Sequence, residues 1–228
     1  MILAAGRGAR MRPLTDKTPK PLVEVAGKPL IQHHVERLVA AGFHRIVINL
    51  AHLGGQISDA LGDGAQFGAE IRYSIEPENG LETAGGIIQA LDLLDSQFIV
   101  VNGDIWTTYD FSRLRDFSLA EQLAHLVMVE TPHYKVHGDF SLADDGKLCL
   151  VEDPNNKLGS RNFTYAGIAV MSKKLFAGWP EGRSALLPLF NAAIDQVRLQ
   201  GEYYDGVWDD IGTLDRLEAL RHRLGKTN

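Results

Sequence analysis

The chain has 228 residues, 45% of them hydrophobic, which is enough to bury a sizeable core and excludes a peptide, a coil or a disordered tail. It carries 29 acidic and 23 basic side chains, and the formal net charge of -6 argues against a general affinity for nucleic acid or for an anionic membrane. Its single cysteine, Cys149, excludes an internal disulfide and a multi-cysteine zinc site. Because no apolar run approaches the ~18 residues of a membrane span and no signal peptide is recognisable, we expect a cytoplasmic protein that acts on small molecules and needs no obligate protein partner.

Strand and helix patterns alternate from the first residue to about residue 94. Residues 1–3 predict the end of a strand, so either the first strand is unusually short or translation starts upstream of Met1. A long loop rich in proline and glycine follows, and then a helix runs from Pro29 to a stop at Gly42. The other expected elements of this half are strands at 46–50, 71–75 and 98–101 and helices at 56–61 and 83–94.

The pattern changes in the second half of the chain. We expect a strand at 123–129, a hairpin at 140–151, a strand at 163–171, an amphipathic helix at 184–199 and a charged terminal helix at 214–224. No internal repeat or flexible linker divides the sequence. Together these patterns predict an α/β fold of Rossmann-like type, in which a mostly parallel, mixed sheet is flanked by helices in a single domain spanning residues 1–228.

Positive charge is concentrated in residues 1–20, which hold five basic side chains and one acidic side chain. Two glycines, Gly6 and Gly8, directly follow the first strand, where backbone N–H groups can approach phosphate oxygens closely. Met11 stands where a dinucleotide fingerprint needs its third glycine, and no Walker lysine follows, so neither nicotinamide binding nor a P-loop is supported. Arg10 and Lys20 instead place fixed cations around the glycines, as a triphosphate site would require, although a solvated basic loop remains the alternative.

The chain resembles the sugar-phosphate nucleotidyltransferases, which join a nucleoside triphosphate to a sugar 1-phosphate and release pyrophosphate. The resemblance covers the whole chain and rests on these segments, in the family's order: L-A-A-G-R-G-A-R-M-R-P-L-T and P-K-P-L near the start, E-N-G-L-E-T-A-G-G-I at 78–87, V-N-G-D at 101–104, F-T-Y-A-G-I at 163–168 and W-D-D-I-G-T at 208–213. It implies that residues 1–110 bind the nucleotide and that residues 111–228 bind the sugar.

The resemblance also assigns roles to the nucleotide side of the site. It implies that Arg10 and Lys20 meet phosphate oxygens. Backbone contacts to the base, ribose and phosphates would come from small or apolar residues, namely Leu3, Ala5, Gly6, Gly8, Gly80, Ala84, Gly85 and Gly86. For the last three residues the alternative is an ordinary loop entering a helix, with Thr83 near its N-cap.

Asp104 and Asp210 are the expected ligands of a magnesium ion. Asp104 ends an apolar strand, where open α/β sheets present their ligands, and the resemblance places Asp210 opposite it. Two carboxylates together with phosphate oxygens and water suit Mg²⁺. The family pattern selects Asp210 over its neighbour Asp209, and the alternative role for either aspartate is that of a turn or helix cap.

The acceptor side is less clearly marked. The resemblance implies sugar-phosphate contacts from Gly138, Glu152, Lys157, Arg161 and Thr164. Many relatives carry Glu-Lys-Pro where this chain has Glu152-Asp153-Pro154, so the lysine that would meet the sugar phosphate is missing and Lys157 is a possible substitute. If the acceptor is a muramic sugar, Lys157 and Arg161 are the candidates to meet its lactyl carboxylate, and both could instead be solvated loop charges.

Within the family, the short chain is most similar to the members that transfer UMP from UTP to N-acetylmuramate 1-phosphate in peptidoglycan recycling. A mannose or glucose 1-phosphate nucleotidyltransferase, or a phosphocholine cytidylyltransferase, would share almost every motif residue. A non-catalytic nucleotide-sensing subunit is a further alternative, which the presence of Arg10, Lys20, Asp104 and Asp210 argues against.

Overall fold

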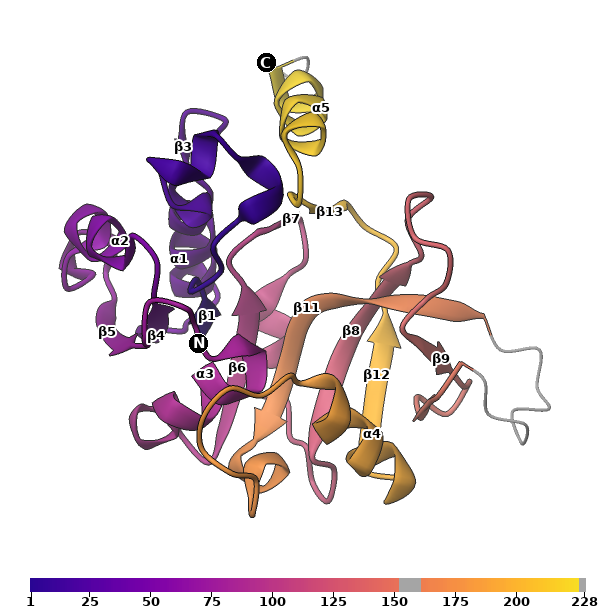
Figure 1. Cartoon of the computed structure of the whole chain (residues 1–228). Helices are drawn as coiled ribbons and strands as arrows, with labels where there is room; N and C mark the ends of the chain where they lie inside the picture. Colours follow the sequence, from indigo (N-terminus) through magenta and orange to yellow (C-terminus); the bar gives the residue numbers. More distant parts are fainter. Residues whose placement is uncertain (152–160, 226–228) are drawn as a thin grey trace.

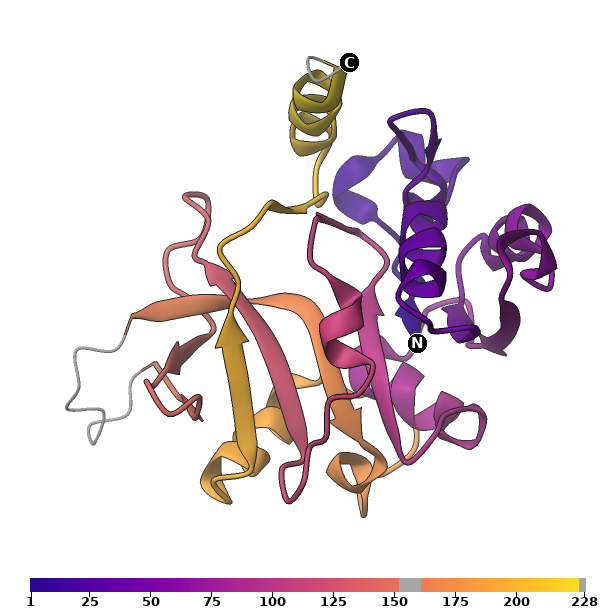
Figure 2. The ribbon, with the colours of Figure 1, turned by 180° about the vertical axis from the view of Figure 1, so that it is seen from behind.

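The computed structural model describes residues 1–151 and 161–225 (Figures 1 and 2). Its strands are β1 (Ile2–Leu3), β2 (Glu24–Val25), β3 (Lys28–Pro29), β4 (Arg45–Leu50), β5 (Glu70–Ile75), β6 (Gln97–Asn102), β7 (Ile105–Thr107), β8 (Ala124–Glu130), β9 (Phe140–Leu142), β10 (Leu148–Cys149), β11 (Asn162–Ser172), β12 (Leu199–Tyr203) and β13 (Trp208–Asp210). Its α-helices are α1 (Leu30–Ala40), α2 (Gly54–Leu61), α3 (Glu82–Ala90), α4 (Leu187–Asp195) and α5 (Leu214–Gly225). None of these helices, within the described residues, is long and apolar enough to cross a membrane.

The first half of the chain builds a parallel sheet in the order β5, β4, β1, β6. The short β1 lies in the middle, with Ile2 opposite Ile48 of β4 on one side and Val101 of β6 on the other. The strand has only two residues, and both of its edges are paired. The carboxyl ends of these strands all point to one edge of the sheet.

The second half extends the sheet in antiparallel fashion. The long strand β11 pairs with β6 and β8, and its first two residues also pair with β9 of the predicted hairpin. Its register against β8 shifts between Tyr165 and Ala169. Gly167 lies in this irregularity with a φ of 74°, and a Cβ there would come within 2.5 Å of the Asn102 side chain, so the bend requires glycine.

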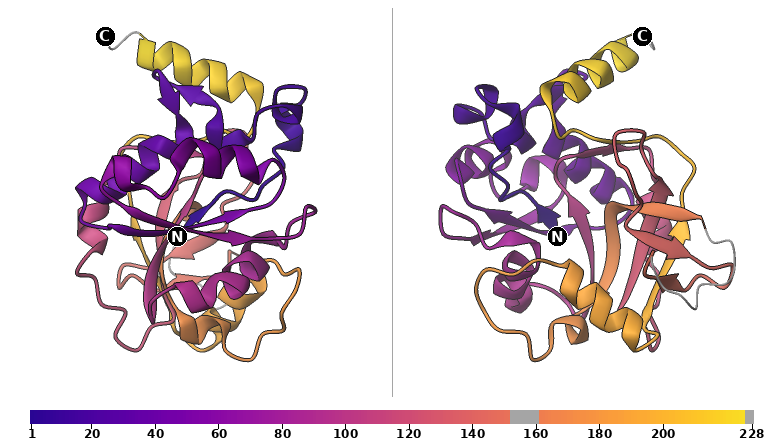
Figure 3. Two further views of the ribbon diagram at one scale, coloured as in Figure 1. Left: turned by 90° about the vertical axis from the view of Figure 1, so that its left-hand side faces the viewer. Right: turned by 45° about the vertical axis from the view of Figure 1, so that its right-hand side comes forward.

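Helices cover both faces of the sheet, with α1 and α2 on one face and α3 and α4 on the other (left panel of Figure 3). Alternate residues of β6 feed the two cores: Ile99 and Val101 pack toward α1, whereas Phe98 and Val100 pack toward α3 and α4. This alternation is the period of an extended strand buried on both sides. The prediction of a mixed sheet flanked by helices in a single domain is confirmed.

The expected helix at 184–199 is wrong at both ends. The helix α4 covers only Leu187–Asp195, and Leu199 begins strand β12. Val197 adopts a φ of 55°, which ends helical geometry, and residues Leu199–Tyr203 then pair in parallel with Ala124–Met128 of β8. The apolar periodicity of the segment could not reveal this pairing because the partner strand is distant in the sequence.

Candidate active site

A cavity of about 390 Å³ opens at the carboxyl ends of β1, β4, β5 and β6. We call it the N-terminal cavity, and its lining is Leu3, Ala4, Ala5, Gly6, Arg7, Lys20, Pro21, Asn49, Glu76, Asn79, Gly80, Glu82, Thr83, Asn102, Asp104 and Arg183. The structure therefore brings together six of the residues selected from the sequence: Leu3, Ala5, Gly6, Lys20, Gly80 and Asp104. Its position is the one at which open α/β sheets bind ligands.

Two buried polar residues that the sequence analysis missed organise this cavity. Asn49 accepts a hydrogen bond from the Ala4 backbone N–H (2.8 Å) and donates one to Glu76 (2.6 Å). The other carboxylate oxygen of Glu76 accepts from the Leu81 backbone N–H (2.7 Å). This chain of bonds ties the start of the glycine loop to the segment at 76–81 across the cavity. Asn49 is the penultimate residue of β4 and Glu76 directly follows β5, so the strand-end signal used for Asp104 could have found them.

The two glycines of the first loop, Gly6 and Gly8, have different structural roles. A Cβ on Gly6 would meet no atom within 4 Å, so its backbone is open toward the cavity it lines. Gly8 instead has a φ of 63°, and a Cβ there would lie 2.9 Å from the Thr15 side chain, whose hydroxyl donates to the Gly8 carbonyl (2.9 Å). Gly8 therefore shapes the loop from outside the lining, and its contact with phosphate stays a prediction.

Ala84, Gly85 and Gly86 are buried in the first turns of α3 and are not part of the cavity lining. A Cβ on Gly85 would lie 2.2 Å from the Gly182 carbonyl oxygen, and one on Gly86 would lie 2.3 Å from Glu76. The backbone N–H groups of Ala84 and Gly85 both donate to the Ser184 carbonyl (3.0 and 3.1 Å). Close packing thus accounts for the small residues here, and their role toward base and ribose stays a prediction.

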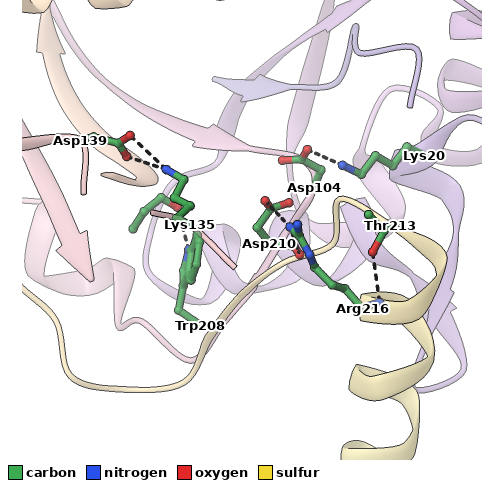
Figure 4. Close-up of polar contacts among 9 residues, drawn as sticks. Lys20, Asp104, Lys135, Asp139, Trp208, Asp210, Thr213 and Arg216 are labelled. Carbon is green, nitrogen blue, oxygen red and sulfur yellow. Dashed lines mark hydrogen bonds and ion pairs between the residues drawn. The ribbon is translucent and has the colours of Figure 1, made fainter. Parts of the chain in front are cut away.

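Lys20 and Asp104 form the ion pair at the centre of the site. The Lys20 ammonium lies 2.5 Å from the Asp104 carboxylate, and the lysine side chain is only 8% exposed, whereas that of Asp104 is 38% exposed (Figure 4). Because the lysine is buried and paired, its ammonium group has little conformational freedom and is fixed beside the carboxylate. It is therefore preorganised to meet a phosphate group that enters the cavity.

A two-stranded sheet, separate from the main one, brings Asp210 to Asp104. In the ladder of β7 and β13, Asp210 lies opposite Ile105, and the Ile211 backbone N–H donates to the Asp104 carbonyl (2.9 Å). Both strands are three residues long. The family resemblance placed the two aspartates opposite each other, and the pairing of these strands is the structural reason that they are neighbours.

Arginines surround Asp210. The Arg216 guanidinium lies 2.7 Å from its carboxylate, and the neighbouring Asp209 pairs with Arg223 instead. A Cβ on Gly212 would lie 2.9 Å from Asp210 Oδ1 and 3.0 Å from Arg10 Nη2. Arg10 and Asp210 thus border the same space beside Gly212, and Asp104 with its partner Lys20 lies next to Ile211; the catalytic roles of these four residues stay predictions.

The two carboxylates fit a magnesium ion. Both are accessible, since the Asp210 side chain is 27% exposed. Within residues 1–151 and 161–225, no group of three or more histidine, cysteine, aspartate or glutamate side chains could hold a metal. The protein would therefore supply two oxygen-donor side chains here, the number Mg²⁺ uses when phosphate oxygens and water complete its shell.

A second cavity of about 660 Å³, which we call the C-terminal cavity, reaches Asp210 from the other side. Its lining is Val129, Glu130, Thr131, Pro132, His133, Tyr134, Tyr203, Tyr204, Asp205, Gly206, Trp208, Asp209, Asp210, Thr213, Asp215, Arg216 and Ala219. Trp208 is oriented by its indole N–H, which donates to the Ala166 carbonyl (2.8 Å). Aromatic rings and carboxylates of this kind suit the stacking and hydrogen bonding of a sugar.

The three predicted acceptor residues that the structure describes, Gly138, Arg161 and Thr164, are not part of the lining of this cavity. Arg161 pairs with Glu130 (2.7 Å) and its guanidinium lies 5.5 Å from the Phe163 ring centroid. Thr164 is buried, and its hydroxyl has no hydrogen-bond partner among the described residues. Gly138 packs against β11, where a Cβ would lie 2.7 Å from Phe163 backbone atoms. Glu152 and Lys157 lie outside the described residues.

Comparisons with known proteins agree with this geometry. Residues 1–226 match the nucleotidyl transferase family. The chain is 51% identical to N-acetylmuramate alpha-1-phosphate uridylyltransferase of Neisseria meningitidis over 99% of its own length and 97% of the relative, and 33% identical to the enzyme of that name in Caulobacter vibrioides over 99% and 96%. A crystal structure of a putative glucose-1-phosphate thymidylyltransferase from Bacillus anthracis has the same fold, with a TM-score of 0.85 and 22% identity over 100% of this chain and 95% of the other.

Proposed function

Because the chain belongs to the nucleotidyl transferase family, we propose that it transfers UMP from UTP to N-acetylmuramate 1-phosphate and releases pyrophosphate. The UDP-sugar formed would return a muramic sugar to peptidoglycan synthesis. The observation that carries this proposal is the convergence of Arg10, Lys20, Asp104 and Asp210 between two cavities, one on the glycine-loop side and one lined by aromatic residues. Relatives at 51% and 33% identity over nearly the full length support the choice of uridylyl donor and muramic acceptor. Since nucleoside triphosphates are made and used in the cytoplasm, we expect the enzyme to act there.

The reaction needs no general base. An oxygen of the sugar phosphate, already anionic at neutral pH, forms a bond to the α-phosphorus of the triphosphate while the bond to the β-phosphate breaks and pyrophosphate departs. The barrier is therefore charge repulsion and alignment. Lys20, fixed beside Asp104, and Arg10, next to Asp210, would offset the charge on the α-phosphate and on pyrophosphate.

Asp104 and Asp210 would hold a magnesium ion, which neutralises phosphate charge when bound. In the protein itself, each carboxylate is already balanced by a cation, Lys20 for Asp104 and Arg216 for Asp210. The chain thus presents a preformed pair of oxygen donors rather than one that must be assembled on binding.

Pyrophosphate release tests the proposal directly. The purified protein is incubated with each of the four ribonucleoside triphosphates and dTTP against muramic, glucosamine, glucose and mannose 1-phosphates and phosphocholine, with Mg²⁺ or with EDTA. We expect UTP with N-acetylmuramate 1-phosphate to give the highest kcat/KM and EDTA to abolish turnover. A higher kcat/KM for another pair would replace the substrates we propose, and binding of a triphosphate without turnover on any acceptor would favour a nucleotide sensor.

A further inference from the structure

Resting on the function proposed above, we propose that Arg216 is the anion-binding residue of the acceptor site and contacts a negatively charged oxygen of the sugar 1-phosphate. Arg216 lies on α5, lines the C-terminal cavity and contacts Asp210. It belongs to none of the sequence motifs from which the site was first recognised. Four observations carry the assignment: the charge of the cavity, the free donors of the guanidinium, its support by an aromatic ring and its convergence with Arg10.

The C-terminal cavity is rich in carboxylates and poor in cations. Its described lining contains five carboxylates, those of Glu130, Asp205, Asp209, Asp210 and Asp215, of which Glu130, Asp209 and Asp210 are paired with arginines. Arg216 is the only lysine or arginine in that described lining. An acceptor that carries a phosphate, and in a muramic sugar also a carboxylate, would be repelled by such a wall unless one cation received it.

The Arg216 guanidinium has N–H groups that are free to donate to a ligand. Both of its hydrogen bonds to Asp210, one to the carboxylate (2.7 Å) and one to the carbonyl (3.4 Å), use Nη1. Among the described residues, Nη2 and Nε make no hydrogen bond. Because arginine presents its five N–H groups as a rigid planar fork, the free edge can bind an oxyanion while Nη1 stays on Asp210.

The ring of Tyr134 holds the guanidinium in place. The guanidinium carbon lies 3.7 Å from the ring centroid, in the range of a close cation–π contact. Tyr134 lies in the loop between β8 and β9, so this loop and α5 together fix the Arg216 side chain. An arginine restrained in this way loses less conformational entropy when it binds an anion.

Arg216 also converges with Arg10. The Cβ that Gly212 lacks would lie 2.9 Å from Arg216 Nη1 and 3.0 Å from Arg10 Nη2, so both guanidiniums border the same small space beside Asp210. With Arg10 expected on the triphosphate, Arg216 stands on the side of the C-terminal cavity, from which the acceptor phosphate would approach.

The Arg161 hypothesis is less favourable than the assignment to Arg216. The Arg161 guanidinium is paired with Glu130 and lies against the rings of Phe163 and Tyr203. It is absent from the described lining of the C-terminal cavity, whereas Arg216 forms part of the wall next to the candidate metal ligand. Arg216 is therefore the better placed of the two to meet an acceptor anion.

Steady-state kinetics of Arg216→Gln and Arg216→Lys test the assignment. With saturating UTP and Mg²⁺, we expect Arg216→Gln to raise the acceptor KM by about tenfold or more, as loss of a charged hydrogen bond does, and to change the UTP KM by less than about threefold. Arg216→Lys should recover part of the loss, since it keeps the charge. Titration calorimetry of the acceptor into enzyme holding a non-hydrolysable UTP analogue gives the same comparison without turnover.

Two acceptors distinguish the anionic group. An equal loss on N-acetylmuramate and N-acetylglucosamine 1-phosphates assigns the contact to the phosphate, and a loss confined to the muramic sugar assigns it to the lactyl carboxylate. An unchanged acceptor KM in Arg216→Gln overturns the proposal. So does a raised Mg²⁺ requirement with an unchanged acceptor KM, which would show that Arg216 only positions Asp210.

Arg221→Gln is the matched control. Arg221 lies on the same helix, five residues further on, and pairs with Glu218, and neither residue belongs to the described lining of the C-terminal cavity. Its loss removes the same charge and should leave the acceptor KM unchanged; a comparable rise would reduce the effect to helix charge and overturn the proposal. Thermal melts of all variants verify folding. If wild type prefers another sugar 1-phosphate, the proposed acceptor is wrong, and the Arg216 variants are then measured with the sugar it uses.

Discussion

Lys20 reaches Asp104 from a position where its side chain is almost fully buried, and this makes the two aspartates unequal. Asp104→Asn leaves that lysine without its charge partner, at a cost of about 1 to 3 kcal/mol of stability. Asp210→Asn costs less, because Arg216 is 23% exposed and can be hydrated. We therefore expect the melting temperature of Asp104→Asn to lie below that of Asp210→Asn.

Both substitutions should lower kcat/KM by roughly two or more orders of magnitude, since each would remove a charge from the proposed magnesium site. The double variant should be little worse than either single variant, because ligands of one ion act as a unit. Binding of Mn²⁺, followed by electron paramagnetic resonance in the presence of UTP, should weaken in parallel. Near-normal turnover in either single variant would contradict the assignment of the metal ligands.

His34 lies next to β7, the strand that pairs with β13, and makes the stability of the fold depend on pH. It is buried on α1, its Nε2 lies 2.9 Å from the Ile105 carbonyl, and burial lowers its pKa to about 4. The neutral ring donates this bond, whereas the unfolded chain takes up a proton near pH 6.5. The contribution of His34 to the free energy of unfolding is therefore fully present above pH 6.5. It is lost as the pH falls toward 4, by up to about 1.4 kcal/mol per pH unit.

His34→Asn should remove this contribution. Urea unfolding between pH 7 and 4.5 should show a shallower decline for the variant than for wild type. His44→Asn, at an exposed histidine, is the control and should follow the wild-type curve. Parallel curves for wild type and His34→Asn would show that the buried imidazole does not determine the decline.

At the scale of elements, α3 packs closely against the backbone at Gly182 because Gly85 has no side chain. A Cβ there would strike the Gly182 carbonyl oxygen at 2.2 Å, and backbone cannot yield as a flexible side chain can. We expect Gly85→Ala to cost about 1 to 3 kcal/mol in urea unfolding. Gly55→Ala on α2 is the matched control, because its Cβ would meet nothing within 4 Å, and it should gain about 0.5 to 1 kcal/mol. Equal effects at both positions would contradict this account of the packing.

The elements that were predicted and those that were missed differ in what determines them. The helix Leu30–Ala40 and the strand Arg45–Leu50 follow from apolar spacing and from a nearby proline and glycine, all within one segment. The strands Leu199–Tyr203, Ile105–Thr107 and Trp208–Asp210 have too little local pattern to be recognised. Each exists because of hydrogen bonds to a partner distant in the chain.

At the scale of the whole molecule, the N-terminal cavity joins segments from residue 3 to residue 183, so a ligand there should stabilise the entire fold. UTP with Mg²⁺ at 100 times its Kd should add about 2.7 kcal/mol. For a chain of this size, that corresponds to a rise in Tm of roughly 5 to 10 °C in a thermal melt. EDTA should reduce the rise, and an equal rise with ATP at the same concentration would contradict selectivity for uridine.

The order of amino acids alone determined the fold class, the basic glycine loop and the candidates Lys20 and Asp104, because hydrophobic period, turn residues and short motifs are local properties of the chain, and the family resemblance added Asp210. Only the tertiary structure decided that Asn49 and Glu76 bridge the first cavity, that the pairing of β7 with β13 brings Asp210 next to Asp104, and that Arg216 lines the second cavity. These depend on contacts between residues far apart in sequence. Such contacts form only when burial of the shared core offsets the entropy of bringing the segments together, and no local pattern records which segments will meet.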